Sequence, residues 1–301
     1  MAHTHTYPIV KLENVKKQFE KDGLSVVENF LTSEEVECLK NEINSIIDNM
    51  KPEDHPKTTF ATYDEDAEPN DDYFLTSQDK IRFFYEEGAI DKDKNLTVDK
   101  HAALNKIGHA LCLLSEPFKK ITFSKKFQDV ARALDYKRPV VAQSMYIFKP
   151  PKIGGAVTGH CDASFLYTSK PSGGVLGYWL ALDDATLDNG CLHYIPGSHK
   201  EWPNDDVAYR FELAGDSAPS PLHFVGEKPA FDESRCVPAP VKKGSLVLLH
   251  SMVWHKSEPN YSDKPRHAYA IHIAETEDCV WSDKNWLQET ETYKFPSLYS
   301  D

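Results

Sequence analysis

The spacing of apolar residues predicts helices in the first part of the chain. Ser33 is a residue type that caps helix N-termini, and apolar residues follow it every three or four positions, as on the buried face of an amphipathic helix. A second segment, from about Val98 to Ser115, has the same spacing and ends before Pro117, a helix-breaking residue. We therefore expect the first hundred residues to be mainly helical. The apolar positions of the first helix are Val36, Leu39, Ile43, Ile46 and Ile47.

The pattern changes at Pro139. From there the chain consists of short apolar or alternating runs that are separated by Gly, Pro and Asn, which is typical of the strands of a sandwich or small barrel. Helices therefore precede strands, and we expect a mainly β-core covered by a helical layer. The predicted strands span 140–148, 175–182, 191–195, 245–250 and 267–274.

One stretch within the strand region departs from this pattern. Residues 202–240 contain six of the nineteen prolines and show little periodicity, and they are too long for an ordinary connection. We interpret them as a long insertion that forms a functional flap. The sequence contains no linker, so we predict a single domain over 1–301, with a mainly helical layer at 1–138 and the β-core at 139–298.

Composition and charge exclude several classes of partner. With 301 residues, of which 40% are hydrophobic, the chain has enough apolar side chain for a full core. The 47 acidic and 34 basic side chains give a net charge of −13, which repels phosphate backbones and anionic lipids. We therefore expect neither nucleic acid nor membranes as partners. Part of the acidic excess lies between Asp64 and Asp72, which we interpret as a solvated loop.

Features that bear on cellular location are weak. The sequence has neither a long apolar run nor the apolar core of a secretory signal near its N-terminus, and its six cysteines are scattered without a C-x-x-C pair. We expect a cytoplasmic protein with reduced thiols. A peroxisomal location is the alternative, because residues 11–19 loosely resemble an N-terminal peroxisomal address. The sequence leaves the oligomeric state unknown.

Two clusters of polar residues carry candidate chemistry. His160 and Asp162 are two positions apart, so at the end of an extended strand their side chains point to the same side and can bind one cation. By itself this H-x-D pair is a weak signal, and a structural histidine beside a turn aspartate is an equally good interpretation. A second cluster strengthens it, because His255 is followed eleven residues later by Arg266.

The combined pattern fits a particular metal site. Two imidazoles and one carboxylate on one triangular face leave three adjacent positions open on an octahedral Fe(II), as non-haem iron oxygenases require. A guanidinium nearby can bind the far carboxylate of a dicarboxylic co-substrate through two hydrogen bonds. Small residues and His272 are in phase with Arg266 on the strand that follows, and they leave room for a ligand. Those small residues are Ala268, Ala270 and Ala274.

Three sequence runs carry a resemblance to a known family. They are GHCDASFLYT at 159–168, LGYWLALDDATLDNGCLHYIPGSHK at 176–200 and KKGSLVLLHSMVWHKSEPN at 242–260. The chain resembles the phytanoyl-CoA dioxygenase family from about residue 19 to residue 298. The resemblance implies a double-stranded β-helix, or jelly roll, which uses Fe(II), 2-oxoglutarate and dioxygen. It implies His160, Asp162 and His255 as iron ligands, and Lys106, Met145, Trp179, Ser257 and Arg266 as 2-oxoglutarate contacts.

The less certain contacts each have a structural alternative. Lys106 is either a surface lysine or faces inward with the apolar stripe of the predicted second helix. Trp179 and Met145 are otherwise core residues, and Ser257 is otherwise a turn serine. Among the other histidines, His193 and His272 are candidates to line the cavity, and the remaining ones are interpreted as structural, with His199 in a turn.

The resemblance implies an oxygenase, and Asp162 favours hydroxylation. Related halogenases replace this carboxylate by a small residue so that halide can bind iron. We expect a small organic or acyl substrate, with release of succinate and CO2. For an acyl-CoA, the basic run at 119–126 could bind the phosphates, although such runs are usually solvated. The alternatives are a catalytically idle 2-oxoglutarate or metal sensor, and a cupin-type metal-binding isomerase, which would leave Arg266 without a role.

Overall fold

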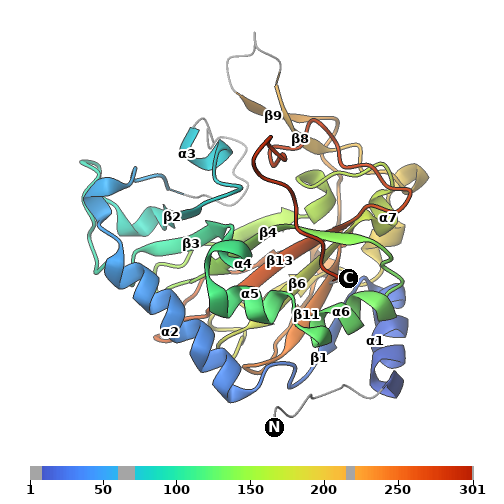
Figure 1. Cartoon of the computed structure of the whole chain (residues 1–301), viewed down its shortest axis with the longest axis horizontal. Coiled ribbons are helices and arrows are strands. Elements are labelled where there is room, and N and C mark those ends of the chain that lie inside the picture. Colours follow the sequence, from blue (N-terminus) through green and yellow to red (C-terminus); the bar gives the residue numbers. More distant parts are fainter. Residues whose placement is uncertain (1–8, 60–71, 215–220, 300–301) are drawn as a thin grey trace.

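Alternation of apolar residues along the strands builds two antiparallel sheets (Figure 1). The structure is a computed structural model that describes residues 9–59, 72–214 and 221–299. Of the acidic run at 64–72, only Asp72 is among the described residues. The strands of the larger sheet are β1 (Leu24–Val27), β2 (Ile81–Tyr85), β3 (Leu104–His109), β4 (Pro139–Ile147), β6 (Val175–Ala181), β11 (Leu246–His250) and β13 (Ala268–Glu275).

The order of the strands defines a jelly roll. In the described part of the chain, the larger sheet has the order β1-β11-β6-β13-β4-β3-β2. The smaller sheet has the order β10-β7-β12-β5 and lies across a cavity that both sheets line. The expected double-stranded β-helix is confirmed, and all five predicted strands are present as β4, β6, β7, β11 and β13. The strands of the smaller sheet are β5 (Val157–His160), β7 (Leu192–Tyr194), β10 (Val237–Ala239) and β12 (His255–Ser257).

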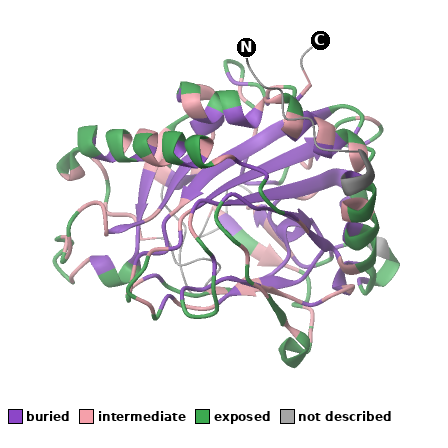
Figure 2. Ribbon diagram, turned by 90° about the horizontal axis from the view of Figure 1, so that it is seen from below, coloured by how far each residue is buried: buried purple, intermediate pink, exposed green. Residues whose placement is uncertain are grey.

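The main helices cover the outer face of the larger sheet. Leu39 and Ile43 of one helix pack in the same apolar cluster as Tyr178 and Tyr269 of the sheet. Figure 2 shows the strands largely buried, whereas the helices expose one side to solvent. The helices of this layer are α1 (Ile9–Asp22), α2 (Ser33–Asn49), α4 (Leu111–Leu114), α5 (Glu116–Thr122) and α6 (Lys125–Ala133). None of the helices among the described residues has the length and apolar character needed to cross a bilayer.

The first helix begins one residue earlier than the sequence suggested. Thr32, not Ser33, is its N-cap: the Thr32 hydroxyl accepts from the backbone N–H of Glu35 at 3.2 Å, and the Glu35 carboxylate accepts from the backbone N–H of Thr32 at 2.8 Å. This capping box satisfies two donors that the helix itself leaves unpaired. The predicted apolar face is confirmed, because Val36, Leu39, Ile43 and Ile47 are all buried.

The second predicted helix is wrong. Residues 104–109 form strand β3, which pairs with β4 on one side and β2 on the other, and only the four residues of α4 are helical in the predicted range. The N-terminal part is therefore less helical than expected, because β1, β2 and β3 extend the larger sheet. The spacing of Ala103, Ile107 and Ala110 is also compatible with a short strand followed by a short helix, both of them buried. Pairing with neighbouring strands therefore decides which element forms.

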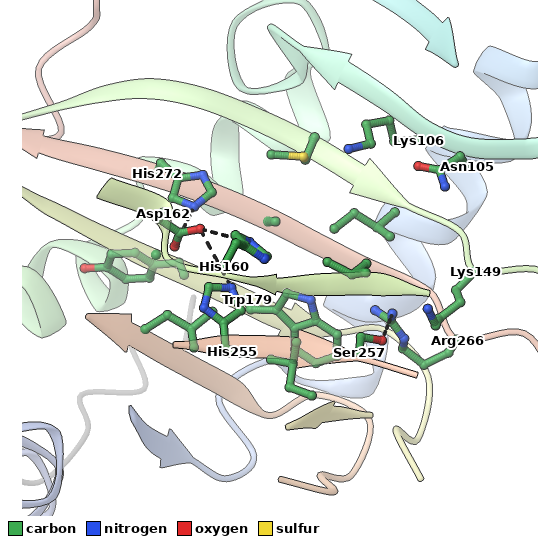
Figure 3. A pocket seen from close by; sticks show the side chains of 18 of the residues that line it. Asn105, Lys106, Lys149, His160, Asp162, Trp179, His255, Ser257, Arg266 and His272 are labelled. Carbon is green, nitrogen blue, oxygen red and sulfur yellow. Dashed lines mark hydrogen bonds and ion pairs between the residues drawn. The ribbon is translucent and has the colours of Figure 1, made fainter. Parts of the chain in front are cut away.

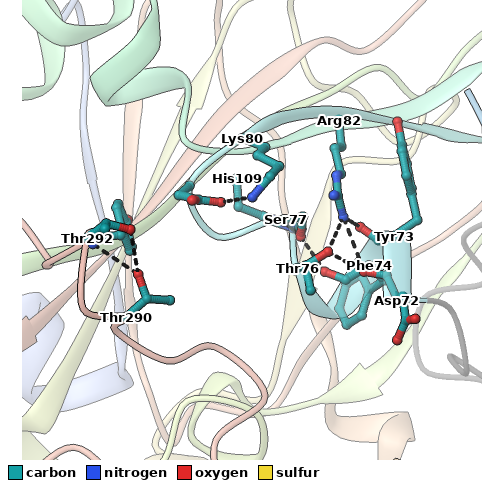
Figure 4. A network of polar contacts seen from close by, with 12 residues as sticks. Asp72, Tyr73, Phe74, Thr76, Ser77, Lys80, Arg82, His109, Thr290 and Thr292 are labelled. Carbon is teal, nitrogen blue, oxygen red and sulfur yellow. Dashed lines mark hydrogen bonds and ion pairs between the residues drawn. The ribbon is translucent and has the colours of Figure 1, made fainter. Parts of the chain in front are cut away.

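Polar contacts hold the segment that precedes β3. The Arg82 guanidinium donates to the Thr76 hydroxyl at 2.7 Å and to the carbonyl oxygens of Asp72 and Tyr73 (Figure 4). Ser77 Oγ lies 2.7 Å from Nδ1 of the buried His109, which is the last residue of β3. These contacts anchor α3 to β2 and β3. The short helical segments outside the main layer are η1 (Pro52–Asp54), α3 (Asp72–Leu75), η2 (Glu87–Ala89), η3 (Asp162–Ser164), α7 (Pro171–Gly174), η4 (Ser198–Lys200), η5 (Pro203–Asp205) and η6 (Glu233–Arg235).

The predicted insertion at 202–240 is more ordered than its composition indicated. Strands β8 (Arg210–Leu213) and β9 (Leu222–Val225) pair as a separate two-stranded sheet that projects from the barrel (Figure 1). β10 pairs with β7 and so belongs to the smaller sheet. The interpretation as an irregular insertion up to residue 240 is therefore wrong in its boundary, because prolines are tolerated on an edge strand such as β10.

Candidate metal and carboxylate site

The cavity between the two sheets is lined by all eight residues that the family resemblance implied for the site. Met145, Trp179 and Ser257 line it from β4, β6 and β12, and Lys106 lines it from β3. Lys106 is 6% exposed, so it is not a surface lysine, and Ser257 lies in a strand and not in a turn. Lys106 faces the cavity because of its position on a strand, and not because of the helix that was predicted there.

Three metal-ligating side chains meet at one end of this cavity (Figure 3). His160 ends β5, Asp162 begins η3 and His255 begins β12, and the register of β5 against β12 places His160 directly opposite His255. The Asp162 Oδ1 atom lies 3.7 Å from His160 Nε2 and 3.8 Å from His255 Nε2. The three candidate ligand atoms lie within 4.8 Å of one another, so one cation can contact all of them.

The backbone fixes the tautomer of both histidines. The His160 Nδ1 atom lies 2.9 Å from the carbonyl oxygen of Thr158, and the His255 Nδ1 atom lies 3.0 Å from that of Val253. A carbonyl can only accept, so Nδ1 carries a proton in each ring and Nε2 is the atom that faces Asp162. Burial lowers the pKa of His160 to about 3, so this imidazole is neutral at physiological pH and can bind a metal.

A further histidine holds the remaining oxygen of the carboxylate. The His272 Nε2 atom lies 3.2 Å from Asp162 Oδ2, and the Gln143 amide nitrogen donates to His272 Nδ1 at 2.9 Å. Gly177 leaves room for this contact, because a Cβ there would lie 3.2 Å from Asp162 Oδ2. Burial opposes ionisation of Asp162, but His272 and His255 outweigh it and keep the pKa of Asp162 below its ordinary value. His272 therefore orients the carboxylate with Oδ1 toward the two imidazoles.

Basic side chains gather at the other end of the same cavity (Figure 3). Arg266 is 2% exposed, its Nη2 atom donates to the Ser257 hydroxyl at 3.4 Å, and its guanidinium carbon lies 5.1 Å from the centre of the Trp179 ring. Its Nε and Nη1 atoms have no hydrogen-bond partner among the described residues. Burial lowers the pKa of Arg266 to about 10, so the group is charged at neutral pH. A buried cation with two unpaired donors is suited to bind an anion.

Sequence reasoning missed Lys149, Glu86 and Asn105, which also line this end. One signal was present for Lys149: Met145, Ile147 and Lys149 alternate, and all three face the cavity. Glu86 directly follows β2 and Asn105 lies within β3, so their positions depend on the sheet extension that the sequence did not predict. Burial raises the pKa of Glu86 above its ordinary value.

Of the two other histidines that were predicted to line the cavity, one does so and the other does not. His272 lines the cavity as expected, whereas His193 is absent from the described lining and its neighbour Leu192 faces inward instead. His199 lies in η4, where it is buried beside His250 with ring centroids 4.7 Å apart. The basic run at 119–126 forms parts of α5 and α6 on the outer face of the larger sheet, away from the cavity.

The fold and the site define a class of protein. A double-stranded β-helix with two histidines and one carboxylate on one face of its cavity has the architecture of the non-haem iron oxygenases. Residues 19–268 match the phytanoyl-CoA dioxygenase family. The chain belongs to this family.

Individual relatives agree with the family assignment. The chain is 52% identical over 289 residues to the phytanoyl-CoA dioxygenase domain-containing protein 1 homolog of Caenorhabditis briggsae, a match that covers 96% of this chain and 99% of the relative. It is 46% identical to phytanoyl-CoA dioxygenase domain-containing protein 1 of Danio rerio, with 94% and 97% covered. The epimerase SnoN, solved with Fe3+, alpha ketoglutarate and nogalamycin RO, has the same fold with a TM-score of 0.63 at 16% identity, with 98% of each chain covered.

Proposed function

We propose that this protein is an Fe(II)- and 2-oxoglutarate-dependent dioxygenase. The observation that carries the proposal is the chemistry of the two ends of one cavity. At one end His160, Asp162 and His255 present ligand atoms to a single point, and at the other end Arg266 has unpaired donors. A dicarboxylate with a 2-oxo group can satisfy both ends at once, because one carboxylate and the keto oxygen suit a metal and the far carboxylate suits a guanidinium. The solved complex of SnoN with Fe3+ and alpha ketoglutarate supports this choice.

Each residue of the site would have a defined task. His160, Asp162 and His255 would hold the iron, and when bound the iron would supply the oxidative chemistry that uses dioxygen. Arg266 and Ser257 would bind the distal carboxylate of 2-oxoglutarate, with Lys106 contributing charge. Trp179 and Met145 would form the apolar wall between the ends and exclude water. The products would be succinate, CO2 and an oxidised substrate.

We infer that the substrate is a small organic or acyl compound that is hydroxylated. Asp162 occupies the ligand position that halogenation would need to be open. Next to the metal end, Phe165 packs against His160 with ring centroids 5.9 Å apart, and Phe211 and Phe224 of the β8-β9 hairpin pack against Phe165. This aromatic surface suits an apolar part of the substrate. The basic run at 119–126 gives no support for CoA phosphates near the metal end, since it lies on the outer face.

The test measures oxygen consumption and succinate formation by the purified protein. Fe(II) and 2-oxoglutarate are supplied with and without fractions of a small-molecule extract. We expect slow succinate formation with both additions and a faster rate with the fraction that contains the substrate. Binding of 2-oxoglutarate without oxygen consumption in any fraction would overturn the enzymatic assignment in favour of a sensor. Turnover that needs a metal but no 2-oxoglutarate would favour a cupin-type isomerase.

A further inference from the structure

Lys149 and Arg266 form a buried pair of like charge at the end of the cavity opposite the triad (Figure 3). Lys149 is 3% exposed and Arg266 is 2% exposed. Burial, and then the Arg266 charge, lower the pKa of Lys149 to about 7. Among the described residues, no carboxylate oxygen lies within 4.0 Å of a nitrogen of either side chain. Two cations in a dry site with no carboxylate in direct contact are unfavourable, because only more distant carboxylates such as Glu86 offset their charges.

The backbone holds the two residues together. The carbonyl oxygen of Lys149 accepts from the backbone N–H of Arg266 at 3.3 Å and from the Asn260 amide at 3.0 Å. Lys149 itself has a φ of 41°, which is uncommon for a residue with a Cβ and is found where the surrounding structure determines the conformation. The chain thus adopts a less favourable backbone conformation at the residue that places a second cation beside Arg266.

A purely structural role accounts for only one of the donors of Lys149. Its ammonium group donates to the carbonyl oxygen of Gly155 at 2.6 Å, which ties the 150–156 loop to the cavity wall. An ammonium group has three N–H donors, so the contact with Gly155 leaves two for a ligand. Glu86 accepts from the backbone N–H of Gly155 at 3.3 Å on the other side of the same peptide, and it forms no ion pair within 4.0 Å with Lys149.

We propose that Lys149 is a second cation that, together with Arg266, binds the distal carboxylate of the co-substrate and so selects 2-oxo dicarboxylates over 2-oxo monocarboxylates. The inference rests on the proposed function, since it assigns a binding residue to the same co-substrate. The carboxylate would accept from both cations and separate their charges. Arg266 would provide direction through its planar donors, and Lys149 would provide a compact charge.

The test compares two ligands that differ only in the distal carboxylate. Calorimetry measures the binding of 2-oxoglutarate and of 2-oxopentanoate to the protein loaded with Mn(II) under anaerobic conditions. The variants are Lys149→Gln, whose amide can still donate to Gly155, and Lys149→Met, which removes every donor. The matched control is Lys152→Met, because Lys152 lies in the same loop, also has a positive φ of 66° and is an exposed residue that pairs with Asp263 at 3.0 Å.

We expect Lys149→Gln and Lys149→Met to weaken 2-oxoglutarate binding by about 10- to 100-fold, as for the loss of a hydrogen bond to a charged group. The affinity for 2-oxopentanoate should change by less than about threefold, so the preference of the protein for the dicarboxylate should fall. Lys149→Arg should retain most of the preference, and Lys152→Met should retain all of it.

Three outcomes would separate failure of this inference from failure of the proposed function. Equal loss of affinity for both ligands in Lys149→Gln would show that Lys149 only supports the loop. Unchanged affinity for both ligands would also overturn the inference. If the wild-type protein binds the metal but neither ligand, the proposed function itself fails. Should Lys149→Met unfold, circular dichroism will show it, and the Gln and Arg variants still decide.

Discussion

The metal end and the basic end of the cavity differ in how the chain holds their polar side chains. At the metal end, each donor group already has its orientation: Thr158 and Val253 hold the two histidine rings, and His272 holds the free oxygen of Asp162. At the basic end, Arg266 has two donors without partners among the described residues. The metal end thus has its three candidate ligand side chains oriented toward one another, while Asp162 Oδ2 lies 3.2 Å from His272 Nε2 and has no hydrogen-bond partner among the described residues. The basic end therefore has hydrogen-bond donors that the described residues leave without a partner, and an anion can bind to them.

The difference also shows how each end is assembled. Two of the three candidate ligands, His160 and His255, lie opposite each other on adjacent strands of one sheet, and Asp162 follows two residues after His160 at the start of η3. The basic end joins β3, Lys149 just after β4 and Arg266 two residues before β13. The sequence analysis predicted a helix where the chain forms β3. This error did not affect the prediction of the triad, but residues of the basic end that lie on or near β3 were missed.

The largest effect is expected at the metal end. Asp162→Ala should abolish metal binding and succinate formation, because it removes the only carboxylate of the triad and leaves two imidazoles. Titration with Fe(II) or Mn(II) and a succinate assay measure the two effects. His193→Ala is the matched control, because this half-buried histidine of β7 lies outside the described lining and should leave both unchanged. A fully active Asp162→Ala protein would contradict the assignment of the iron ligands.

Substitution at the basic end should weaken the co-substrate but leave the metal. Arg266→Met should reduce 2-oxoglutarate affinity by about 100- to 1,000-fold, since it removes the partner of a desolvated carboxylate. Without co-substrate the variant should be as stable as the wild type or more stable, because an uncompensated buried cation is gone. Calorimetry and thermal unfolding measure the two effects. A large loss of stability without ligand would mean that the basic end is complete by itself.

The contact of His272 with Asp162 should matter less than the ligands themselves. His272→Ala should reduce metal affinity by about 10- to 100-fold, because it releases Asp162 Oδ2 and lets the carboxylate turn away. The visible spectrum of the Co(II)-loaded protein reports the ligand geometry independently of activity. His272→Gln, which can still donate to Asp162, should recover part of the affinity. An unchanged Co(II) spectrum in the Ala variant would show that Asp162 needs no such support.

The basic end should make co-substrate binding depend on pH. Burial lowers the pKa of both Lys149 and Lys106 to about 7. The groups that face them include Arg266, which opposes protonation of Lys149, and Glu86 and Glu258, which favour it. A bound dianion stabilises the protonated lysines, so 2-oxoglutarate affinity should be highest below about pH 7 and fall as the pH rises through it.

Calorimetry in buffers of different ionisation enthalpy measures this coupling directly, because proton uptake accompanies binding near neutral pH. The effect should be smaller in Lys149→Met, where one of the two titrating lysines is absent. Affinity that is constant between pH 6 and pH 9 would contradict the titration of Lys149 and Lys106 near neutral pH.

The smallest effect is expected outside the cavity. Thr32→Ala removes the N-cap of α2 and should lower the free energy of unfolding by about 1 kcal/mol. Denaturant unfolding measures the loss. Metal and co-substrate affinities should stay at wild-type values, because α2 packs on the outer face of the larger sheet. A loss of ligand affinity in this variant would mean that the helical layer controls the cavity, and the two ends could no longer be treated separately.

The sequence predicted the parts of the site that depend on local geometry. His160 and Asp162 point to one side because they are two residues apart in an extended segment, and Ala270 and His272, which are in phase with Arg266, line the cavity for the same reason. Lys106 was placed in the site by family resemblance, while the helix proposed around it is a strand. The inward direction was correct although the element was wrong.

The residues that the sequence missed depend on contacts between distant segments. The apolar spacing at 98–115 suits a helix as well as a strand, and only pairing with β4 and β2 decides for β3. Lys149 continues the alternation of Met145 and Ile147 on β4. Its position beside Arg266, however, depends on the backbone hydrogen bond between Lys149 and Arg266, which are far apart in the chain.

The sequence by itself predicted where the core strands lie along the chain and the residues that are candidate metal ligands. These follow from side-chain period and from ligand chemistry, which act over a few residues. The tertiary structure decided which N-terminal segments extend the larger sheet and which charges share the basic end. Those outcomes depend on the burial of one surface by another, because desolvation of Lys149 and Arg266 arises only when the sheets and the connecting loop close around them.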